Sequence, residues 1–265
     1  MPTPPLIAFA HVGKSFDDGR VRAVDNVSLE VAAGEFLAIV GGSGSGKTTL
    51  LRLANRLIEA DTGHITVEGY DVRAVDPVAL RRRIGYVFQS GGLFPHFSVA
   101  GNIGITPKLQ GLPAEEISAA VDELLELVRL DRALYRERFP HELSGGQRQR
   151  VGVARALAAR PKIVLMDEPF GALDPLTRDA LGDDFRDLHR KLGLTTVMIT
   201  HDMTEAILLA DRVAVMRGGK LLAQGTPSEL SQSDDPYVGE LLGTPRRQAA
   251  RLQMLLPKDG GDGAA

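Results

Sequence analysis

The sequence predicts an α/β protein in which a parallel sheet is covered by helices and interrupted by a helical insertion. In the first and last parts of the chain, apolar runs of strand length alternate with helical segments, and this alternation is typical of a parallel sheet. A glycine-rich loop stands between one of these strands and the next helix. Between about residues 90 and 160 the pattern is helical, which indicates an insertion into the α/β core.

Strand-forming residues dominate the first forty positions. After them a helix is expected from about Lys47, because apolar residues recur there at helical spacing. A shorter helix is expected at Asp76-Pro77, with Asp as N-cap and Pro at the first helical position. The expected strands of this part are Leu6–Ala10, Val27–Val31, Phe36–Val40, His64–Val67 and Ile84–Phe88.

The insertion and a second alternating part complete the expected order of elements. Pro113–Leu130 carries an amphipathic stripe with a period near 3.6. In the tail, one short helix is expected at Tyr237–Leu242, and residues 259–265 are expected to be disordered. The elements expected after the insertion are strand Ile163–Met166, helix Pro175–Leu192 with Asp174 as N-cap, strand Thr196–Thr200, helix Asp202–Ala210, strand Arg212–Met216 and, across a Gly218-Gly219 hairpin, strand Lys220–Ala223.

The composition narrows the class of protein. With 265 residues, 43% of them hydrophobic and 25% charged, the chain resembles ordinary globular proteins and has room for a sizeable core. A formal net charge of −3 argues against nucleic-acid binding through a basic surface, and a Cys count of 0 excludes disulfides. No apolar run approaches the roughly 18 residues of a membrane helix, and the N-terminus lacks a secretory pattern. We therefore expect a soluble, cytoplasmic chain.

Gly41–Thr48 matches the nucleotide-binding loop G-x-x-x-x-G-K-[ST] at every fixed position. Backbone N–H groups at a helix N-terminus hold phosphate oxygens, Lys47 adds a charge for the β- and γ-phosphates, and Thr48 offers a hydroxyl to Mg²⁺. The alternative is a glycine-rich turn with a chance Lys-Thr pair, but the flanking strand and helix favour the nucleotide loop. The expected phosphate-binding residues are Gly41, Gly42, Ser43, Gly44, Ser45, Gly46, Lys47, Thr48 and Thr49.

Two carboxylates end the apolar strand Ile163–Met166. Asp167 can lie near Mg²⁺, directly or through water, and Glu168 can orient an attacking water. Acidic residues at a strand end are often only solvated, and by themselves these two are explained equally well in that way. Their occurrence in the same chain as a phosphate loop favours the catalytic interpretation.

A second glycine-rich segment, Leu143-Ser144-Gly145-Gly146-Gln147, opens a helix but has no lysine. Ser144 can cap the helix, and the free N–H groups and the helix dipole favour an anion. Two glycines at a helix start cost stability, so a binding role is favoured over a purely structural one. Because a nucleotide has one terminal phosphate, a second anion-binding segment needs an explanation.

Three single residues complete the candidate site. Gln89 ends the strand Tyr86–Phe88 where the insertion begins, and His201 ends another strand within reach of a γ-phosphate. A lone histidine at this position is more often an ordinary residue at a helix start with no catalytic task. Phe16 could stack on a base, but by itself it is better explained as a core aromatic.

Together these segments resemble the nucleotide-binding subunits of ABC transporters, from about Ile7 to Leu230. The resemblance implies a P-loop NTPase core, RecA-like and mostly parallel, with an N-terminal antiparallel β subdomain and a helical insertion specific to the family. It implies one domain at residues 1–235, with its core at about 1–89 and 161–235 and the insertion at about 90–160. A short, partly disordered tail is expected at 236–265.

The resemblance also assigns roles and cofactors. It implies binding of ATP and Mg²⁺, with Glu168 as catalytic base and Lys47, Gln89 and His201 as further catalytic residues. Metal ligation is implied for Thr48, Gln89 and Asp167. The nucleotide-binding residues implied outside the loop are Phe16, Ser144, Gly145, Gly146, Gln147 and Asp174.

In this family two subunits pair head to tail, and the signature segment of one covers the ATP held by the other. The resemblance therefore implies a homodimer, and it explains why one chain carries two anion-binding segments. Each ATP would lie between Gly41–Thr48 of one copy and Leu143–Gln147 of the other.

Flanking segments resemble importer subunits for glycine betaine, carnitine, choline and related osmoprotectants. They are Leu53–Glu59, Gln89–His96 and Thr244–Ala249, whereas Asp167–Pro175 resembles the corresponding segment of importers in general. The resemblance implies transmembrane permease subunits as partners and, through them, a periplasmic or lipid-anchored substrate-binding protein. The chain would lie at the cytoplasmic face of the inner membrane. With a Trp count of 0 and 5% aromatic residues, no aromatic cage for a quaternary amine is expected in this chain.

Some features depart from the family pattern. Gly42 stands where many relatives have Pro, and Phe16 replaces a commoner Tyr. Many osmoprotectant ATPases carry paired regulatory CBS domains after the core, and we expect no ionic-strength sensing through such domains here. The alternatives are an importer ATPase for another small solute, such as an amino acid or an anion, or a soluble ABC ATPase that acts on ribosomes or DNA. A P-loop kinase is disfavoured because no acceptor site is recognisable.

Overall fold

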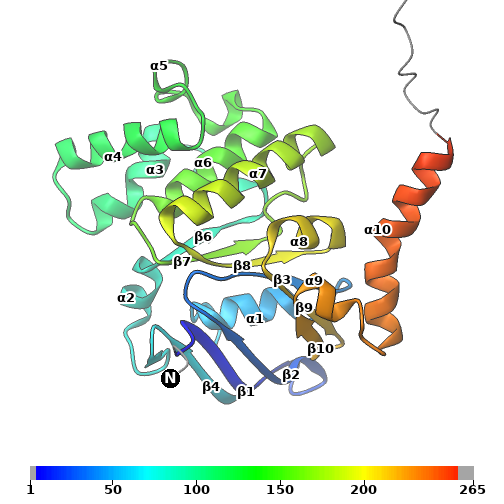
Figure 1. Ribbon diagram of the computed structural model, residues 1–265. Helices are drawn as coiled ribbons and strands as arrows, with labels where there is room; N and C mark the ends of the chain where they lie inside the picture. The colour runs from blue at the N-terminus through cyan, green and yellow to red at the C-terminus, as the bar shows by residue number, and fades with distance from the viewer. Residues whose placement is uncertain (1–3, 256–265) are drawn as a thin grey trace, which may run out of the picture.

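The computed structural model describes residues 4–255, which form two sheets with helices around them (Figure 1). The larger sheet has six strands in the order β10 (Lys220–Gly225), β9 (Arg212–Arg217), β3 (Phe36–Val40), β8 (Thr195–Thr200), β7 (Ile163–Asp167) and β6 (Ile84–Val87). Neighbouring strands pair in parallel, apart from the antiparallel pair of β9 and β10. The predicted mostly parallel sheet is therefore confirmed.

The smaller sheet is antiparallel and corresponds to the expected N-terminal subdomain. Its strand order is β2 (Val21–Val31), β1 (Ile7–Phe16), β4 (Thr62–Val67) and β5 (Tyr70–Asp71). β1 and β2 form a longer hairpin than the sequence indicates. The register of the pair shifts between Phe9 and Ser15. A register shift moves side chains to the opposite face, so alternation is lost there and periodicity alone does not reveal the strand.

Helices cover both faces of the larger sheet (Figure 1). One face contacts α1 (Lys47–Ala54), and the other contacts α6 (Gly145–Leu157), α7 (Pro175–Leu192) and α8 (Met203–Leu209). The buried leucines of α1 contact strands of both sheets, so this helix lies between them. The strand and the helix that flank the glycine-rich loop are thus both held in the core.

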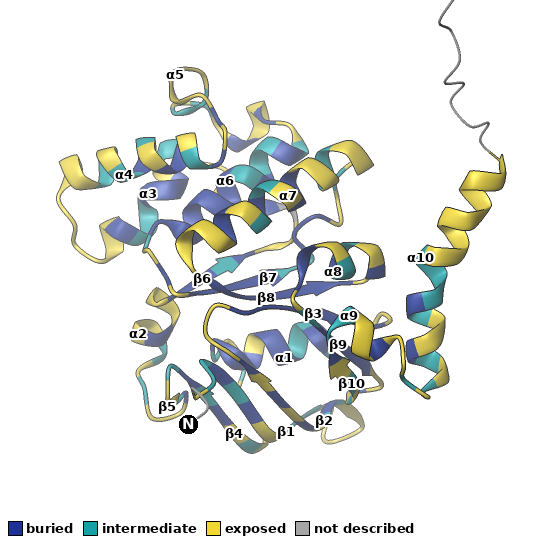
Figure 2. Cartoon of the chain, in the orientation of Figure 1, coloured by how far each residue is buried: buried dark blue, intermediate teal, exposed yellow. Residues whose placement is uncertain are grey.

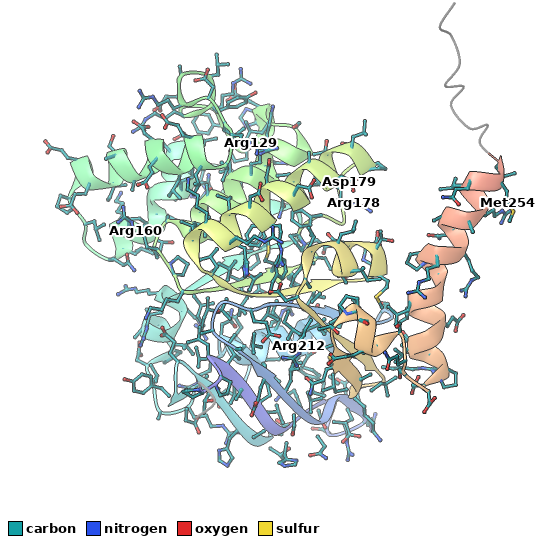
Figure 3. The ribbon with its side chains drawn as sticks, in the orientation of Figure 1. Arg129, Arg160, Arg178, Asp179, Arg212 and Met254 are labelled. Carbon is teal, nitrogen blue, oxygen red and sulfur yellow. The ribbon has the colours of Figure 1, made fainter. Side chains whose placement is uncertain are left out.

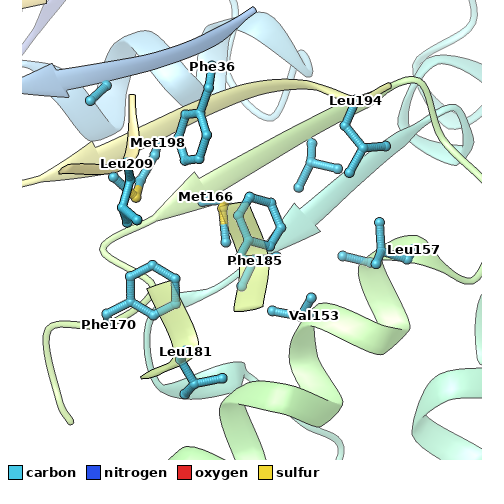
Figure 4. Close-up of a cluster of buried hydrophobic side chains, with 14 of the residues drawn as sticks. Phe36, Val153, Leu157, Met166, Phe170, Leu181, Phe185, Leu194, Met198 and Leu209 are labelled. Carbon is cyan, nitrogen blue, oxygen red and sulfur yellow. The ribbon is translucent and has the colours of Figure 1, made fainter. Parts of the chain in front are cut away.

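Alternate residues of the central strand β3 belong to two separate cores. Phe36 and Val40 pack with α7 and α8, whereas Leu37 and Ile39 pack with α1. Phe36 meets Phe185 of α7 edge to face, with ring centroids 5.8 Å apart (Figure 4). Burial on both faces explains why this strand is a continuous apolar run in the sequence.

The segment between β6 and β7 is helical, as predicted. Before α6 it contains η1 (Gln89–Gly91), α3 (Val99–Leu109), α4 (Ala114–Leu127), α5 (Arg132–Tyr135) and η2 (Pro140–Glu142). The amphipathic stripe after Pro113 forms α4. The buried Asn102 of α3 holds the preceding loop, because its amide donates to the carbonyls of Phe94, Phe97 and Ser98 and accepts from the N–H of Phe94.

Predicted helix starts are confirmed by their caps. Asp76 caps α2 (Pro77–Arg82), Asp174 caps α7 and Asp202 caps α8. In each case the carboxylate accepts from N–H groups of the first turn, which otherwise lack partners. Asp174 is itself a predicted nucleotide-binding residue, and Asp202 directly follows the candidate residue His201, so both caps fix the position of candidate segments.

The C-terminal helix is much longer than predicted. The sequence indicates one short helix at Tyr237–Leu242, whereas α10 covers Pro236–Leu255 and follows the short α9 (Pro227–Leu230). Pro245 lies inside α10. A proline removes one backbone hydrogen bond, and the residues after it are mostly strong helix formers, so the helix continues.

The two halves of α10 differ in their surroundings. Val238 and Leu242 anchor the first half in the core, and the second half is exposed (Figure 2). Across residues 4–255, no helix combines the length and the apolar character needed to cross a bilayer. The predicted disorder at 259–265 lies outside the described residues.

The start of the helical insertion is held against α6, which lies near its end, by the contact of η1 with that helix. A Cβ on Gly91 would lie 2.8 Å from the carbonyl oxygen of Arg148, so the two backbones touch. The guanidinium of Arg155 donates to the carbonyls of Gly91 and Gly92, at 2.8 Å each, and lies over the rings of Phe88 and Phe94. Arg155 is buried, and this burial lowers its pKa. The segment that begins at Gln89 is therefore tied to the helix that begins at Gly145.

Replacement of Arg155 by Met should lower the free energy of unfolding by about 2–5 kcal/mol, because the buried carbonyl of Gly91 and the partly buried carbonyl of Gly92 lose a charged donor. The measurement is equilibrium unfolding in denaturant. Arg190→Met, at an exposed position of α7, is the matched control and should cost less than about 1 kcal/mol. Equal stability losses in the two variants would contradict a special role for Arg155.

Candidate functional site

The candidate site residues gather at the carboxyl edge of the larger sheet. β3, β8 and β7 are parallel neighbours, so their carboxyl ends lie side by side. β3 leads into the loop at Gly41, β7 ends at Asp167, and β8 ends immediately before His201. Ligands of open α/β sheets bind outside the carboxyl ends of the strands. Three segments far apart in sequence thus form one site.

Glycine is required at two positions of the loop because the backbone passes close to other strands. A Cβ on Gly41 would lie 2.1 Å from the carbonyl oxygen of Met216, and one on Gly46 would lie 2.1 Å from that of Ala23. Gly46 has a φ of 100°, which favours glycine, and directly precedes α1. Within residues 4–255 no side chain caps α1, so its first N–H groups are available to an anion.

Lys47 bends back over the loop. Its ammonium donates to the carbonyl oxygens of Gly41 and Gly42, at 2.8 and 3.0 Å. Burial lowers the pKa of Lys47, and the carboxylates of Glu168 and Asp167 oppose that shift. The ammonium is therefore held within the loop and near both carboxylates.

The remaining loop residues divide into an exposed rim and a buried base. Gly42, Ser43 and Gly44 are exposed, whereas Ser45 is buried. Thr48 and Thr49 are half-buried in the first turn of α1. A phosphate chain can thus approach the rim from solvent while the base stays packed.

Asp167 is held between two hydroxyl groups. Thr48 Oγ1 donates to one carboxylate oxygen at 3.1 Å, and the hydroxyl of Tyr86 donates to the other at 3.3 Å. Burial and the charge of Asp167 raise the pKa of Tyr86, which keeps this donor protonated. Tyr86 was not predicted as a site residue, because only the pairing of β6 with β7 brings its strand beside Asp167.

The Thr48–Asp167 pair fits Mg²⁺. This ion takes hydroxyl and carboxylate oxygens and completes its octahedral shell with water and substrate phosphates. In the part of the chain that the structure describes, no group of three or more His, Asp or Glu side chains forms a dedicated cage.

Glu168 lies between Gln89 and His201. The Gln89 amide donates to Glu168 Oε2 at 3.3 Å, and His201 Nδ1 lies 3.5 Å from the same oxygen. Glu168 has a φ of 45°, an uncommon backbone conformation for a residue other than glycine. Gln89, also predicted as a metal ligand, makes its hydrogen bond here rather than with Thr48 or Asp167. The structure thus brings three predicted catalytic residues together.

The second glycine-rich segment forms a capping box at the start of α6. Ser144 Oγ accepts from the N–H of Gln147, and the Gln147 side chain accepts from the N–H of Ser144 and donates to Tyr135. A Cβ on Gly146 would lie 2.6 Å from Thr177 of α7, so Gly146 serves helix packing. Gly145 meets only ordinary contacts and is half-buried. The hydrogen bonds of Ser144 and Gln147 thus stay within the helical insertion.

Arg178 links the segments after Glu168 and after His201. It donates to the carbonyl of Leu173 at 3.1 Å and to the carboxylate of Asp202 at 3.4 Å. It projects from α7 toward α8 (Figure 3). The side chain of Asp174 is engaged in its cap with Thr177, and this bond lowers the pKa of Asp174. Arg178 was missed because only the packing of α7 on α8 reveals its partners.

Phe16 lies at the end of β1 with 40% of its surface exposed, beside the ammonium of Lys14. This exposure argues against the core alternative and leaves part of the ring accessible to solvent. The turn after it contains Asp17 and Asp18, both with positive φ.

This geometry defines a P-loop nucleotide-binding protein whose α/β core carries a helical insertion. A family model described as ABC transporter matches residues 24–171, more than half of the chain. The chain therefore belongs to the ABC transporter family.

Two sequence relatives and one solved structure are similar to this chain. The choline transport ATP-binding protein OpuBA of Bacillus subtilis (strain 168) is 47% identical over 242 residues, which are 91% of this chain and 63% of that protein. The glycine betaine uptake system ATP-binding protein YehX of Escherichia coli (strain K12) is 48% identical over 239 residues, 90% of this chain and 77% of that protein. A post-hydrolysis dimer of the ATP-binding cassette MJ0796, bound to ADP and Pi, has a TM-score of 0.75 and 30% identity over 83% of this chain and 98% of that chain. The chain spans less than two thirds of the length of the Bacillus relative.

Proposed function

We propose that this chain is the ATP-hydrolysing subunit of an ABC importer for an osmoprotectant such as glycine betaine, choline or carnitine. The observation that carries the proposal is that Lys47, the Thr48–Asp167 pair and Glu168 converge at one sheet edge. Gln89 and His201 contact Glu168 there. These groups match the needs of phosphoryl transfer, which are positioning and charge stabilisation.

Each residue of the site has a separate role in ATP hydrolysis. Backbone N–H groups of the loop and the ammonium of Lys47 hold the phosphates. Thr48 and Asp167 would hold Mg²⁺, which would supply charge that stabilises the transferred group. Glu168 orients a water in line with the bond to the leaving ADP and accepts its proton as the oxygen joins phosphorus. Gln89 and His201 both face Oε2 of Glu168, which leaves Oε1 for that water.

The second anion-binding segment supports a head-to-tail homodimer. Ser144–Gln147 starts a helix whose hydrogen bonds stay within its own insertion, so the segment does not complete the loop site of the same chain. A copy related by a two-fold axis would bring it over the phosphates held by Gly41–Thr48. The similarity to a dimeric cassette bound to ADP and Pi supports this arrangement.

An exposed surface just after η1 supports a permease as the partner. Phe94 and His96 are exposed just after η1, where the core meets the helical insertion. Arg155 ties this segment to α6, so a partner that docks here would be connected to the signature segment. Through the permease the subunit would lie at the cytoplasmic face of the inner membrane and serve a periplasmic or lipid-anchored binding protein. The names of OpuBA and YehX support choline or glycine betaine as the solute.

Glu168→Gln should retain ATP binding but lower kcat for hydrolysis by about a hundredfold or more, because the amide does not accept the proton. Size-exclusion chromatography with MgATP should show a trapped dimer. Glu116→Gln, at an exposed position on α4, is the control and should hydrolyse ATP normally. Normal turnover in Glu168→Gln would refute the assignment of the base.

Mixed dimers test the shared sites. Lys47→Met damages the loop and Ser144→Arg damages the signature segment, so neither homodimer has an intact site. A heterodimer of the two variants has one intact site, made of the loop of one copy and the signature of the other. It should therefore hydrolyse ATP faster than either homodimer. No recovery in purified heterodimers would favour sites completed within one chain.

The solute is tested with the subunit, its permease and its binding protein reconstituted in liposomes. Hydrolysis should be stimulated, and solute taken up, with glycine betaine, choline or carnitine. Glutamate and phosphate, an amino acid and an anion, are the matched controls. Stimulation only by a control solute would overturn the osmoprotectant assignment and leave the ATPase assignment intact.

A further inference from the structure

A hydrogen bond joins the first turn of α10 to the phosphate loop. The backbone N–H of Gly42 donates to the hydroxyl oxygen of Tyr237, with 3.0 Å between the two atoms. The two residues are 195 positions apart in the chain, so this contact exists only in the folded protein. It connects a helix outside the predicted site to the loop expected to hold phosphate.

The peptide between Gly41 and Gly42 carries this contact to Lys47. A trans peptide is planar, so its N–H and its C=O point in opposite directions, and the described chain has no cis peptide. The N–H of this peptide is bound by Tyr237, and its carbonyl oxygen accepts from Lys47 Nζ at 2.8 Å. Holding one end of the unit therefore fixes the direction of the other. Hydrogen bonds that share a peptide also polarise one another.

Tyr237 is itself held firmly. The carboxylate of Asp235 accepts from the N–H groups of Tyr237 and Val238, at 2.8 and 3.2 Å, and Val238 is fully buried. The guanidinium carbon of Arg217 lies 4.6 Å from the centre of the Tyr237 ring. The backbone, the neighbouring side chain and the ring face are all fixed, so the hydroxyl is aimed at Gly42.

The loop end of this contact has no comparable support from its own side chains. Gly41 and Gly42 have none, and Gly42 is exposed. The carbonyl of Gly42 also accepts from Lys47 Nζ and from the N–H of Ser45. The peptides on both sides of Gly42 therefore each provide one carbonyl acceptor for the ammonium of Lys47. A rotation of the Gly41–Gly42 peptide would remove one of the two carbonyl acceptors of the ammonium.

We propose that Tyr237 is a positioning residue for Lys47 and acts through the Gly41–Gly42 peptide. This inference rests on the proposed role of the loop as the ATP site. The hydroxyl holds the peptide in the orientation in which two carbonyls direct the ammonium toward the phosphates. Tyr237 does not touch the nucleotide, so its removal changes affinity by loosening the loop rather than by deleting a ligand contact.

Tyr237→Phe removes only the hydroxyl and should raise Kd and KM for ATP about threefold to tenfold, the equivalent of one neutral hydrogen bond. kcat at saturating ATP should change less than twofold, and the denaturation midpoint of the nucleotide-free protein should stay within experimental error. Tyr70→Phe, at a 60% exposed tyrosine of β5, is the control and should leave all of these values unchanged. A lower midpoint with unchanged Kd would show that Tyr237 only anchors α10, and would overturn the proposal.

A double-mutant cycle tests the route through Lys47. Binding of ATP is measured for Lys47→Met with and without Tyr237→Phe. Without the ammonium, the orientation of the Gly41 carbonyl has little effect, so Tyr237→Phe should then change Kd by less than twofold. An undiminished effect of Tyr237→Phe in the Lys47→Met background would refute this route. If Lys47→Met alone leaves ATP binding intact, the proposed function of the loop fails instead, which distinguishes the two failures.

Discussion

The parallel pairing of β3, β8 and β7 is the constraint on which the site depends. Each strand is buried along most of its length, although β8 carries three threonines, and polar or glycine-rich residues follow where it ends. Because the three strands run in the same direction and are paired in register, their ends reach one edge together. Backbone hydrogen bonds therefore bring Lys47, Asp167 and Glu168 near one another, although more than a hundred residues separate the loop from the carboxylates.

Close backbone contacts refine this arrangement. The loop fits only because Gly41 and Gly46 lack side chains where the backbone meets Met216 and Ala23. This contact with strands of both sheets explains why the small antiparallel sheet, which carries no predicted catalytic residue, is needed to shape the site. Lys47 is buried in the same region, and the neighbouring carboxylates offset the electrostatic cost of burying its charge.

A chain of packed groups connects the site to more distant surfaces. Gln89 contacts Glu168 at one end of η1, and Gly91 and Gly92 at the other end are held by Arg155 of α6. Arg178 connects the segments that follow Glu168 and His201 in a similar way. A movement of the helical insertion would thus displace Gln89 and the start of α6, the two places to which the proposed function assigns a partner chain and the nucleotide of a second copy.

Local patterns in the sequence determined most elements and most site residues of this protein. The nucleotide loop, the carboxylates after β7, the caps at Asp76, Asp174 and Asp202, and the helical insertion all follow from short-range physical chemistry that is written within a few neighbouring positions. The length of α10 was mispredicted because the glycine and proline near its middle indicate a break more strongly than the helix formers after them indicate continuation.

Only the tertiary structure decided the contacts between distant segments. Tyr86 beside Asp167, Arg155 beneath η1, Arg178 between two loops and Tyr237 against Gly42 involve residues with no local signal, because each is an ordinary helix or strand residue until the sheet pairing and helix packing supply its partner. The same holds for the register shifts of β1, where pairing with β2 overrides the lost alternation. Chemistry that depends on residue type can be predicted from the chain, whereas positioning depends on geometry that exists only after folding.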